Sequence, residues 1–184
     1  MKKIFLIALG GLIMSACVSC KKDDNTNNDD NNNNQIPDIH YEFTVSGDHN
    51  QHEEIHIPGG IQSDYTATGS YQSQTDLLNV SFTQVTQGGW VVGLLAETDF
   101  FDAGGTYSLT ENAICQFEQV AFKATSGNIS LTKVDFFVEN NGMSQYFVDG
   151  TFTGTYEEIE PEEPNPPRVI NITGEFSGVP LTSF

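Results

Sequence analysis

His52 and His56 enclose the sequence HEEIH, which matches the H-E-x-x-H pattern of zinc hydrolases. In that class of enzyme, two imidazoles four residues apart share one face of an α-helix and bind the metal, and the first glutamate acts as a general base. The pattern therefore raises the hypothesis of a metal-dependent hydrolase, which stands only if the flanking residues form a helix.

The flanking residues predict a strand instead. Gly47 lies upstream and the sequence IPGG begins at Ile57, which leaves fewer than ten residues for a helix. The only apolar residues, Ile55 and Ile57, are two positions apart, which is the period of a strand. We therefore expect Ile55 and Ile57 to face a core, together with Glu53.

A strand separates the two histidines. His52, Glu54 and His56 then face water, and at roughly 3.3 Å per residue the outer two are about 13 Å apart, too far for one ion. No histidine follows His56, so a third ligand would have to be a carboxylate such as Glu97 or Glu111. The sequence therefore predicts a protein that is not an enzyme and needs no cofactor.

A surface metal site is an alternative. All four histidines lie between positions 40 and 56. Adjacent strands can bring His40 and Glu42 close to His52, Glu54 or His56, and such a cluster has the ligand types that bind zinc or copper. A zinc-dependent hydrolase built on this cluster is the corresponding alternative function.

Two further sites are candidates. Asp99 and Asp102 in TDFFDAGG offer loop oxygens for calcium, although acidic residues there also cap turns. Glycan binding needs exposed aromatic rings. Trp90 shares an inward face with its apolar neighbours, so Tyr65 and Tyr71 are the better candidates.

The N-terminus predicts a signal peptide over residues 1–19. Lys2 and Lys3 precede an apolar run of 11 residues from Ile4 to Met14. A membrane span needs about 20 apolar residues, so the run is too short to cross a bilayer. Loss of both lysines on cleavage takes the formal net charge from −18 to −20. This charge repels nucleic acid, which we do not expect as a partner.

A cysteine at the cleavage site indicates lipidation. The region resembles a bacterial lipoprotein signal, with Cys20 as the acylated residue and Cys17 as the alternative. The sequence CKKDD also resembles the start of surface lipoproteins of the Bacteroidetes type, in which a lysine and two acids direct export to the outer face. The resemblance assigns that role to Lys22, Asp23 and Asp24, and it implies an outer-membrane protein facing the exterior.

Residues 20–36 form the predicted spacer. The stretch KKDDNTNNDDNNNNQ has no apolar residue, so we expect it to be disordered. About 15 flexible residues give a mean reach on the order of 20 Å. The domain is thus predicted to stand off the lipid surface.

Residues 37–184 are predicted to form an all-β domain. Apolar residues alternate in runs such as IHYEFTVSG and LLNVSFTQV, and GWVVGLLAE suggests a central strand. Asn141-Gly142 predicts a hairpin, and DAGGT and TSGN predict further turns. We expect an antiparallel β-sandwich or partly closed barrel of about eight to ten strands, with Cys115 buried inside it.

The C-terminal half contains a weak repeat. VDGTFTG at 148–154 and ITGEFSG at 172–178 share the spacing glycine, aromatic, glycine, which predicts two paired strands of one hairpin. Gly150 and Gly174 would let a ring approach closely. The connection EEIEPEEPNPP, with five glutamates and four prolines, predicts a protruding loop.

The same half resembles a Bacteroidetes lipoprotein domain family of uncharacterised function. The matching segments are GTYSL at 105–109, SGNISLTKVD at 126–135, VDGTFTG at 148–154 and VINITGEFSGVPL at 169–181. The resemblance implies fold and location, but no catalytic residue or ligand. We expect a non-enzymatic domain that binds a ligand, a glycan or an envelope protein, with a structural envelope component as the alternative.

Overall fold

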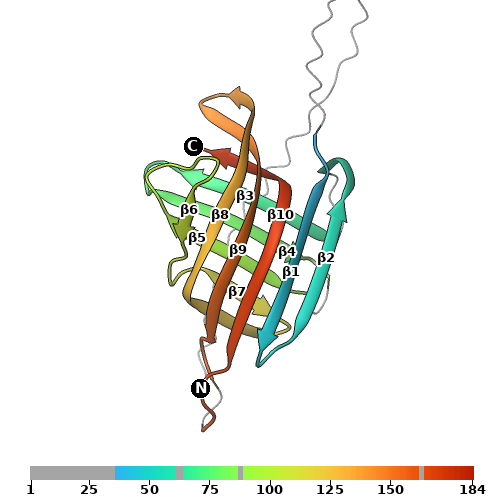
Figure 1. The fold of residues 1–184 in the computed structure, drawn as a ribbon, viewed down its shortest axis with the longest axis vertical. Helices are drawn as coiled ribbons and strands as arrows, with labels where there is room; N and C mark the ends of the chain where they lie inside the picture. Colours follow the sequence, from blue (N-terminus) through green and yellow to red (C-terminus); the bar gives the residue numbers. More distant parts are fainter. Residues whose placement is uncertain (1–35, 61–63, 87–88, 162–163) are drawn as a thin grey trace, which may run out of the picture. The chain divides into compact units, whose positions relative to one another are not determined.

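The computed structural model describes residues 36–60, 64–86, 89–161 and 164–184, which form one ten-stranded sheet (Figure 1). This confirms the predicted all-β class. A short 3-10 turn, Pro58–Gly60, follows β2. The strands are β1 (Ile39–Gly47), β2 (Gln51–Ile57), β3 (Tyr65–Gln72), β4 (Leu77–Gln84), β5 (Val91–Glu97), β6 (Thr106–Ser108), β7 (Ile114–Phe117), β8 (Val120–Asn140), β9 (Met143–Glu158) and β10 (Val169–Ser183).

The predicted signal peptide, both candidate acylated cysteines, the export signal and all but the last residue of the predicted spacer lie outside the described residues. In the described part of the chain, no helix is long and apolar enough to cross a membrane.

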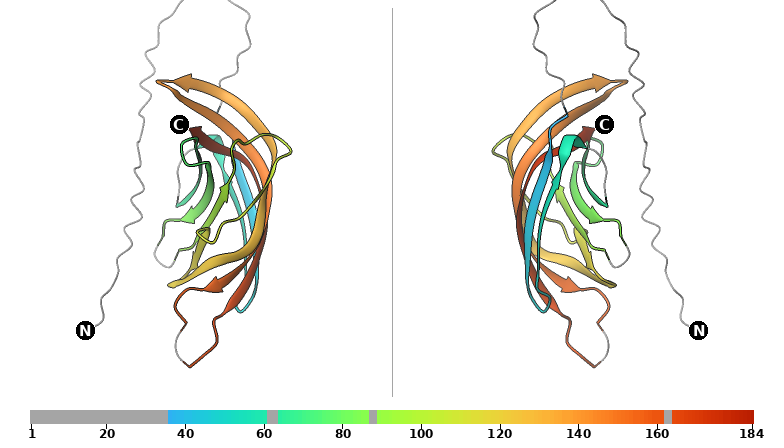
Figure 2. Two further views of the ribbon diagram at one scale, coloured as in Figure 1. Left: turned by 90° about the vertical axis from the view of Figure 1, so that its left-hand side faces the viewer. Right: turned by 90° about the vertical axis from the view of Figure 1, so that its right-hand side faces the viewer.

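The sheet closes partly on itself. Its order is β2-β1-β10-β3-β4-β5-β7-β8-β6, and β9 pairs with both β10 and β8. These pairings form a ring that is not a regular barrel, with β1 and β2 extending beyond it. All the pairs are antiparallel except β3 with β10. The strands curve so that the two halves of the sheet face each other (Figure 2).

Strand β10 pairs with three other strands. Along one edge it pairs with β9, and on the other it pairs first with β1 and then with β3. The change of partner coincides with a register shift between Phe176 and Val179, where Gly178 has a φ of +66°. A Cβ at Gly178 would lie 2.2 Å from the carbonyl oxygen of Asp38. Only glycine fits this bulge.

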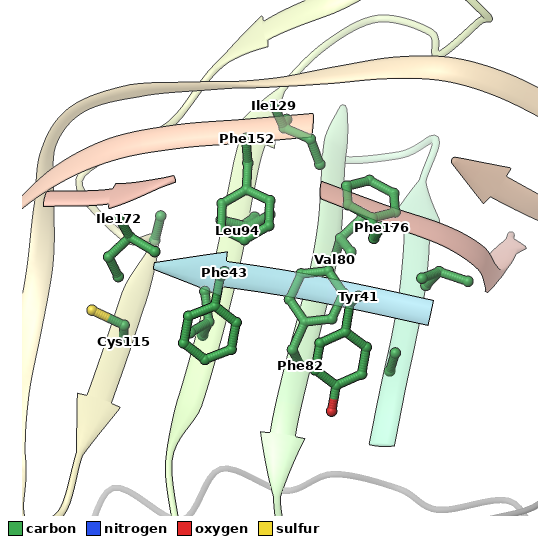
Figure 3. Packing of buried hydrophobic residues seen from close by; sticks show 14 of the residues in the cluster. Tyr41, Phe43, Val80, Phe82, Leu94, Cys115, Ile129, Phe152, Ile172 and Phe176 are labelled. Atoms are coloured by element: carbon green, nitrogen blue, oxygen red, sulfur yellow. The ribbon is translucent and has the colours of Figure 1, made fainter. Parts of the chain in front are cut away.

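Aromatic rings fill the space between the two halves of the sheet (Figure 3). The ring centroids of Tyr41 and Phe82 are 4.8 Å apart, and those of Phe43 and Trp90 are 4.7 Å apart. Phe82 also stacks on Phe152 of β9 at 5.6 Å. Because these contacts join β1 and β9 to β4 and to the segment before β5, the core depends on the alternation predicted from the sequence.

The predicted C-terminal hairpin is confirmed. Gly150 lies opposite Phe176, and Gly174 opposite Phe152. Each aromatic ring covers the glycine on the neighbouring strand, because a Cβ at Gly150 or Gly174 would lie 2.7 or 2.6 Å from the ring. The rings thus replace the side chains that the glycines lack. The β9–β10 connection protrudes beyond the sheet, as predicted (Figure 1).

One predicted turn is wrong. The sequence TSGN lies inside the long strand β8, where Thr125 is the extra residue of a bulge and Gly127 lies opposite Gly154 of β9. A Cβ at Gly127 would come within 2.4 Å of the Thr153 carbonyl oxygen. The glycine therefore permits close backbone packing and not a change of chain direction. In contrast, Asn141-Gly142 does form the predicted hairpin turn.

We expect Gly178→Ala to lower the free energy of unfolding by about 2–3 kcal/mol, because it adds both a positive φ and a backbone clash. Gly104→Ala is the matched control, since Gly104 has a φ of +87° and a Cβ added there would meet no atom within 4 Å. Urea denaturation measures both variants. Equal losses at the two positions would show that the close approach to Asp38 is unimportant.

Candidate functional site

The HEEIH sequence lies in β2, as predicted, and not in a helix. β2 pairs in antiparallel fashion with β1 along the sheet edge. Ile55 and Ile57 are buried, whereas His52, Glu54 and His56 are exposed on the outer face. The fold therefore turns both imidazoles towards solvent at separate positions along one strand.

Each histidine of HEEIH faces a different acid. His52 Nε2 lies 3.8 Å from Glu42 Oε1, and His52 Nδ1 shares a 3.1 Å hydrogen bond with the Thr44 hydroxyl. His56 Nε2 lies 3.1 Å from Asp38 Oδ2. The pairs are exposed, so each contributes little to stability. The two imidazoles of the motif thus pair with two different acids, Glu42 and Asp38.

A row of three glutamates crosses the same face. Glu42 of β1 is directly opposite Glu54 of β2 and Glu175 of β10. Like charges placed opposite each other destabilise a sheet. His40 lies 3.7 Å from Glu54, and together with His52 it places imidazoles at the sides of the row. A shallow hollow of about 250 Å³ lies over this row beside Gly174.

Adjacent strands therefore bring His40 close to Glu54 and Glu42 close to His52, as separate pairs. Within the residues that the structure describes, however, no three His, Cys, Asp or Glu side chains form a group that could hold a metal ion. Glu97 and Glu111 do not join such a group. The geometry offers cross-strand pairs, which lack the third ligand of a zinc site.

The candidate calcium loop forms a turn cap. Asp102 Oδ1 accepts a hydrogen bond from the Tyr107 hydroxyl at 3.1 Å, and the Asp102 amide donates to the same hydroxyl oxygen at 2.9 Å. The Asp99 backbone carbonyl accepts a hydrogen bond from the Tyr71 hydroxyl. The Asp102 carboxylate thus holds the turn before β6, consistent with the capping interpretation.

Tyr71 does not provide an exposed ring for a glycan. It is 6% exposed and packs on Phe101 at 5.1 Å. Tyr65 is half-buried, 6.4 Å from Trp90, and its hydroxyl accepts from Gln84 Nε2. Nothing in the local sequence DYTATGSYQ indicates that the loop after β5 packs Phe101 on the Tyr71 ring and accepts a hydrogen bond from its hydroxyl.

Cys115 is buried in β7, as predicted, and is a free thiol. Burial raises its pKa far above the usual value, so the thiolate is disfavoured. This environment fits a small core residue and not a nucleophile.

The sequence analysis missed an exposed apolar surface on the β8–β9 hairpin. Residues 134–148, here called the arm, form the turn end of this hairpin, and its tip projects at one end of the sheet (Figures 1 and 2). Strand β10 pairs with the β9 side of the arm as far as Ser144. On the arm Phe136 is 60% exposed, and Val138 and Met143 are also exposed. The signal was the run FFV at 136–138, which places apolar side chains on both faces of a strand.

Comparisons with known proteins identify no relative. No protein-family model, curated protein or solved structure matches the chain.

We expect zinc calorimetry at neutral pH to give the same weak heats for the unaltered chain and for the His52→Ala, His56→Ala variant, because the two imidazoles pair with different acids. A saturable zinc site that disappears in the double variant would contradict this arrangement and favour the metal-dependent alternative.

Asp38 connects the start of β1 to the turn after β2. Its Oδ1 accepts from the Gly59 amide at 2.6 Å, and its Oδ2 lies 3.1 Å from His56. The Gly59 amide is the main cause, and His56 the second cause, of a lowered Asp38 pKa. A lowered carboxylate pKa stabilises the fold above the unfolded-state pKa, and this contribution is lost as pH falls through the folded pKa.

We therefore expect Asp38→Asn to destabilise the protein near pH 7, with a difference from the unaltered chain that shrinks as pH falls below about 4. Urea midpoints measured across pH report it. His56→Ala should keep part of the difference, because Gly59 still donates. A difference that grows on acidification would reverse the assigned sign.

Proposed function

We propose that this chain is a lipid-anchored outer-membrane protein of the Bacteroidetes surface type, and that its β domain acts by non-enzymatic binding. The N-terminal residues support the anchor, because a short apolar run leads to Cys20 and then to Lys22, Asp23 and Asp24. Two or more acyl chains hold a protein stably on a membrane, whereas one holds it only marginally.

The observation that carries the binding role is the exposed apolar surface of the arm. Phe136, Val138 and Met143 lie outside the core at the turn end of the β8–β9 hairpin, where β10 pairs with the β9 side as far as Ser144. Gathered apolar side chains that stay in solvent mark interaction surfaces. A ligand, a glycan or an envelope protein are the partner classes expected from the sequence.

The rigid support of this surface favours binding. Phe136 contacts Tyr146 at a centroid distance of 5.7 Å, Tyr146 contacts Phe101 at 5.2 Å, and Phe101 contacts the buried Tyr71. This row of rings connects the arm to the domain, so the exposed ring is held in place before any partner arrives. Preorganised aromatic side chains lose little entropy on binding.

Metabolic labelling with a radioactive fatty acid tests the anchor. We expect the precursor to incorporate label and to partition with membranes. Cys20→Ala should lose the label and release the protein, because no thiol remains at the acylation position, whereas Cys17→Ala should keep it. The reverse pattern would move the acylation site to Cys17, and label in neither protein would refute the anchor.

A further inference from the structure

Exposed apolar side chains gather at one end of the domain, here called the arm end. Of the ten large hydrophobic side chains exposed in the described residues, six lie there, between 39% and 63% exposed. These six are Ile36, Phe100, Phe136, Val138, Met143 and Phe184.

The strand pairings bring the six together from distant parts of the chain. Ser183 at the end of β10 pairs with Ser144 of the arm. The Phe184 carbonyl accepts from the Ser73 amide at 3.0 Å in the β3–β4 turn. The Tyr71 hydroxyl bonds to the Asp99 carbonyl, which places Phe100 beside the same turn. One end of the sheet therefore carries the arm, the chain terminus and the loop after β5.

The chain also enters the domain at this end. Ile36 lines a groove of about 230 Å³ together with Phe137 and Phe147 of the arm and Pro180 of β10. The residues that precede Ile36 are the predicted spacer, whose reach is on the order of 20 Å. An acyl group on Cys20 would therefore hold the lipid surface within reach of the arm end.

The most acidic stretch of the chain belongs to the other end. The connection from β9 to β10 protrudes from the end opposite the arm (Figure 1), and the sequence from 157 to 163 has five glutamates, of which Glu158 is paired with Arg168. An anionic surface avoids a membrane interface that carries negative charge, and an apolar surface partitions into the boundary between headgroups and acyl chains. This distribution directs the arm end, and not the acidic loop, towards lipid.

We propose that the arm end docks on the lipid surface that holds the anchor, with Phe136, Val138 and Met143 inserted among the outermost acyl carbons. The proposal rests on the lipid anchor proposed above. Glu139 and Asn140 at the tip of the arm stay in the headgroup layer. Docking fixes the orientation of the domain and points the acidic β9–β10 connection away from the membrane.

The acidic residues of the arm end set its lipid preference. Asp76, Asp99, Asp102, Asp135 and Glu139 lie in the β3–β4 turn, in the loop after β5 and on the arm, where Asp135 is paired with Lys133. Their repulsion opposes binding to anionic lipid, so docking driven by apolar contact is stronger on zwitterionic than on anionic vesicles. A basic membrane-binding patch has the opposite preference.

The test uses the mature chain from position 20 with Cys20→Ser, so that no acyl group contributes. We expect this protein to bind phosphatidylcholine vesicles in a flotation assay, and less strongly when phosphatidylserine is added. Phe136→Ser with Met143→Ser should lower the partition coefficient by about tenfold or more, because two apolar side chains are lost from the interface. Ile159→Ser with Val169→Ser, at the opposite end and equally solvent-accessible at 41% each, is the matched control and should leave binding unchanged.

A second measurement does not depend on removing apolar groups. Trp90 is 2% exposed, so a tryptophan introduced by Phe136→Trp is the chain's only surface indole. Vesicles of brominated phosphatidylcholine should quench its fluorescence, and should not quench that of Ile159→Trp.

Three results would overturn the proposal: no flotation of the mature chain, equal loss in the control pair, or an unquenched indole at position 136. Self-association abolished by the arm substitutions would instead assign the surface to a second copy. Failure of the anchor itself appears separately, in the fatty-acid labelling.

Discussion

The fold depends on the ability of β10 to change partner. One edge of this strand pairs with β9 throughout, so the other edge must serve both β1 and β3. The bulge at Gly178 makes this possible, and without it the chain of pairings from β3 to β9 would not return to β10. Closure in turn brings Tyr41 of β1 and Phe152 of β9 against Phe82 of β4, and it places the C-terminus beside the arm. A local backbone conformation thus controls both the core and the arrangement of the exposed surface.

Whether two residues four positions apart can bind the same ion depends on the secondary structure that holds them. In a helix, residues four apart project to the same side one turn away, whereas in a strand they point the same way but lie about 13 Å apart. The edge strand β2 therefore separates His52 from His56, and each meets its own acid, Glu42 within β1 and Asp38 just before it. Charged side chains on this edge also disfavour pairing with another chain. The HEEIH sequence is explained by the sheet surface on which it lies.

The sequence predicted the elements that follow from local rules. Alternation identified the buried faces of β1, β4 and β10, and Asn141-Gly142 identified the β8–β9 turn because both residues take positive φ there. The turn predicted at TSGN was wrong because Gly127 lies opposite Gly154 of β9. The need for a glycine there becomes visible only when β9 is paired in register. The prediction of an exposed Tyr71 ring was wrong for a similar reason, since Phe101 and the Asp99 carbonyl, which contact it, belong to a distant loop. The run FFV indicated apolar side chains on both faces of a strand, but which face stays uncovered depends on the tertiary arrangement around the arm.

The two ends of the domain differ. Exposed apolar side chains gather at the arm end, and the most acidic stretch of the chain belongs to the other end. The proposed tether would present one end of the domain to lipid repeatedly, and the contacts at that end would then act at high effective concentration. Weak apolar contacts would be sufficient under that condition. Because Ile36 lines a groove with Phe137 and Phe147 of the arm, the proposed tether would enter the domain beside its exposed apolar surface.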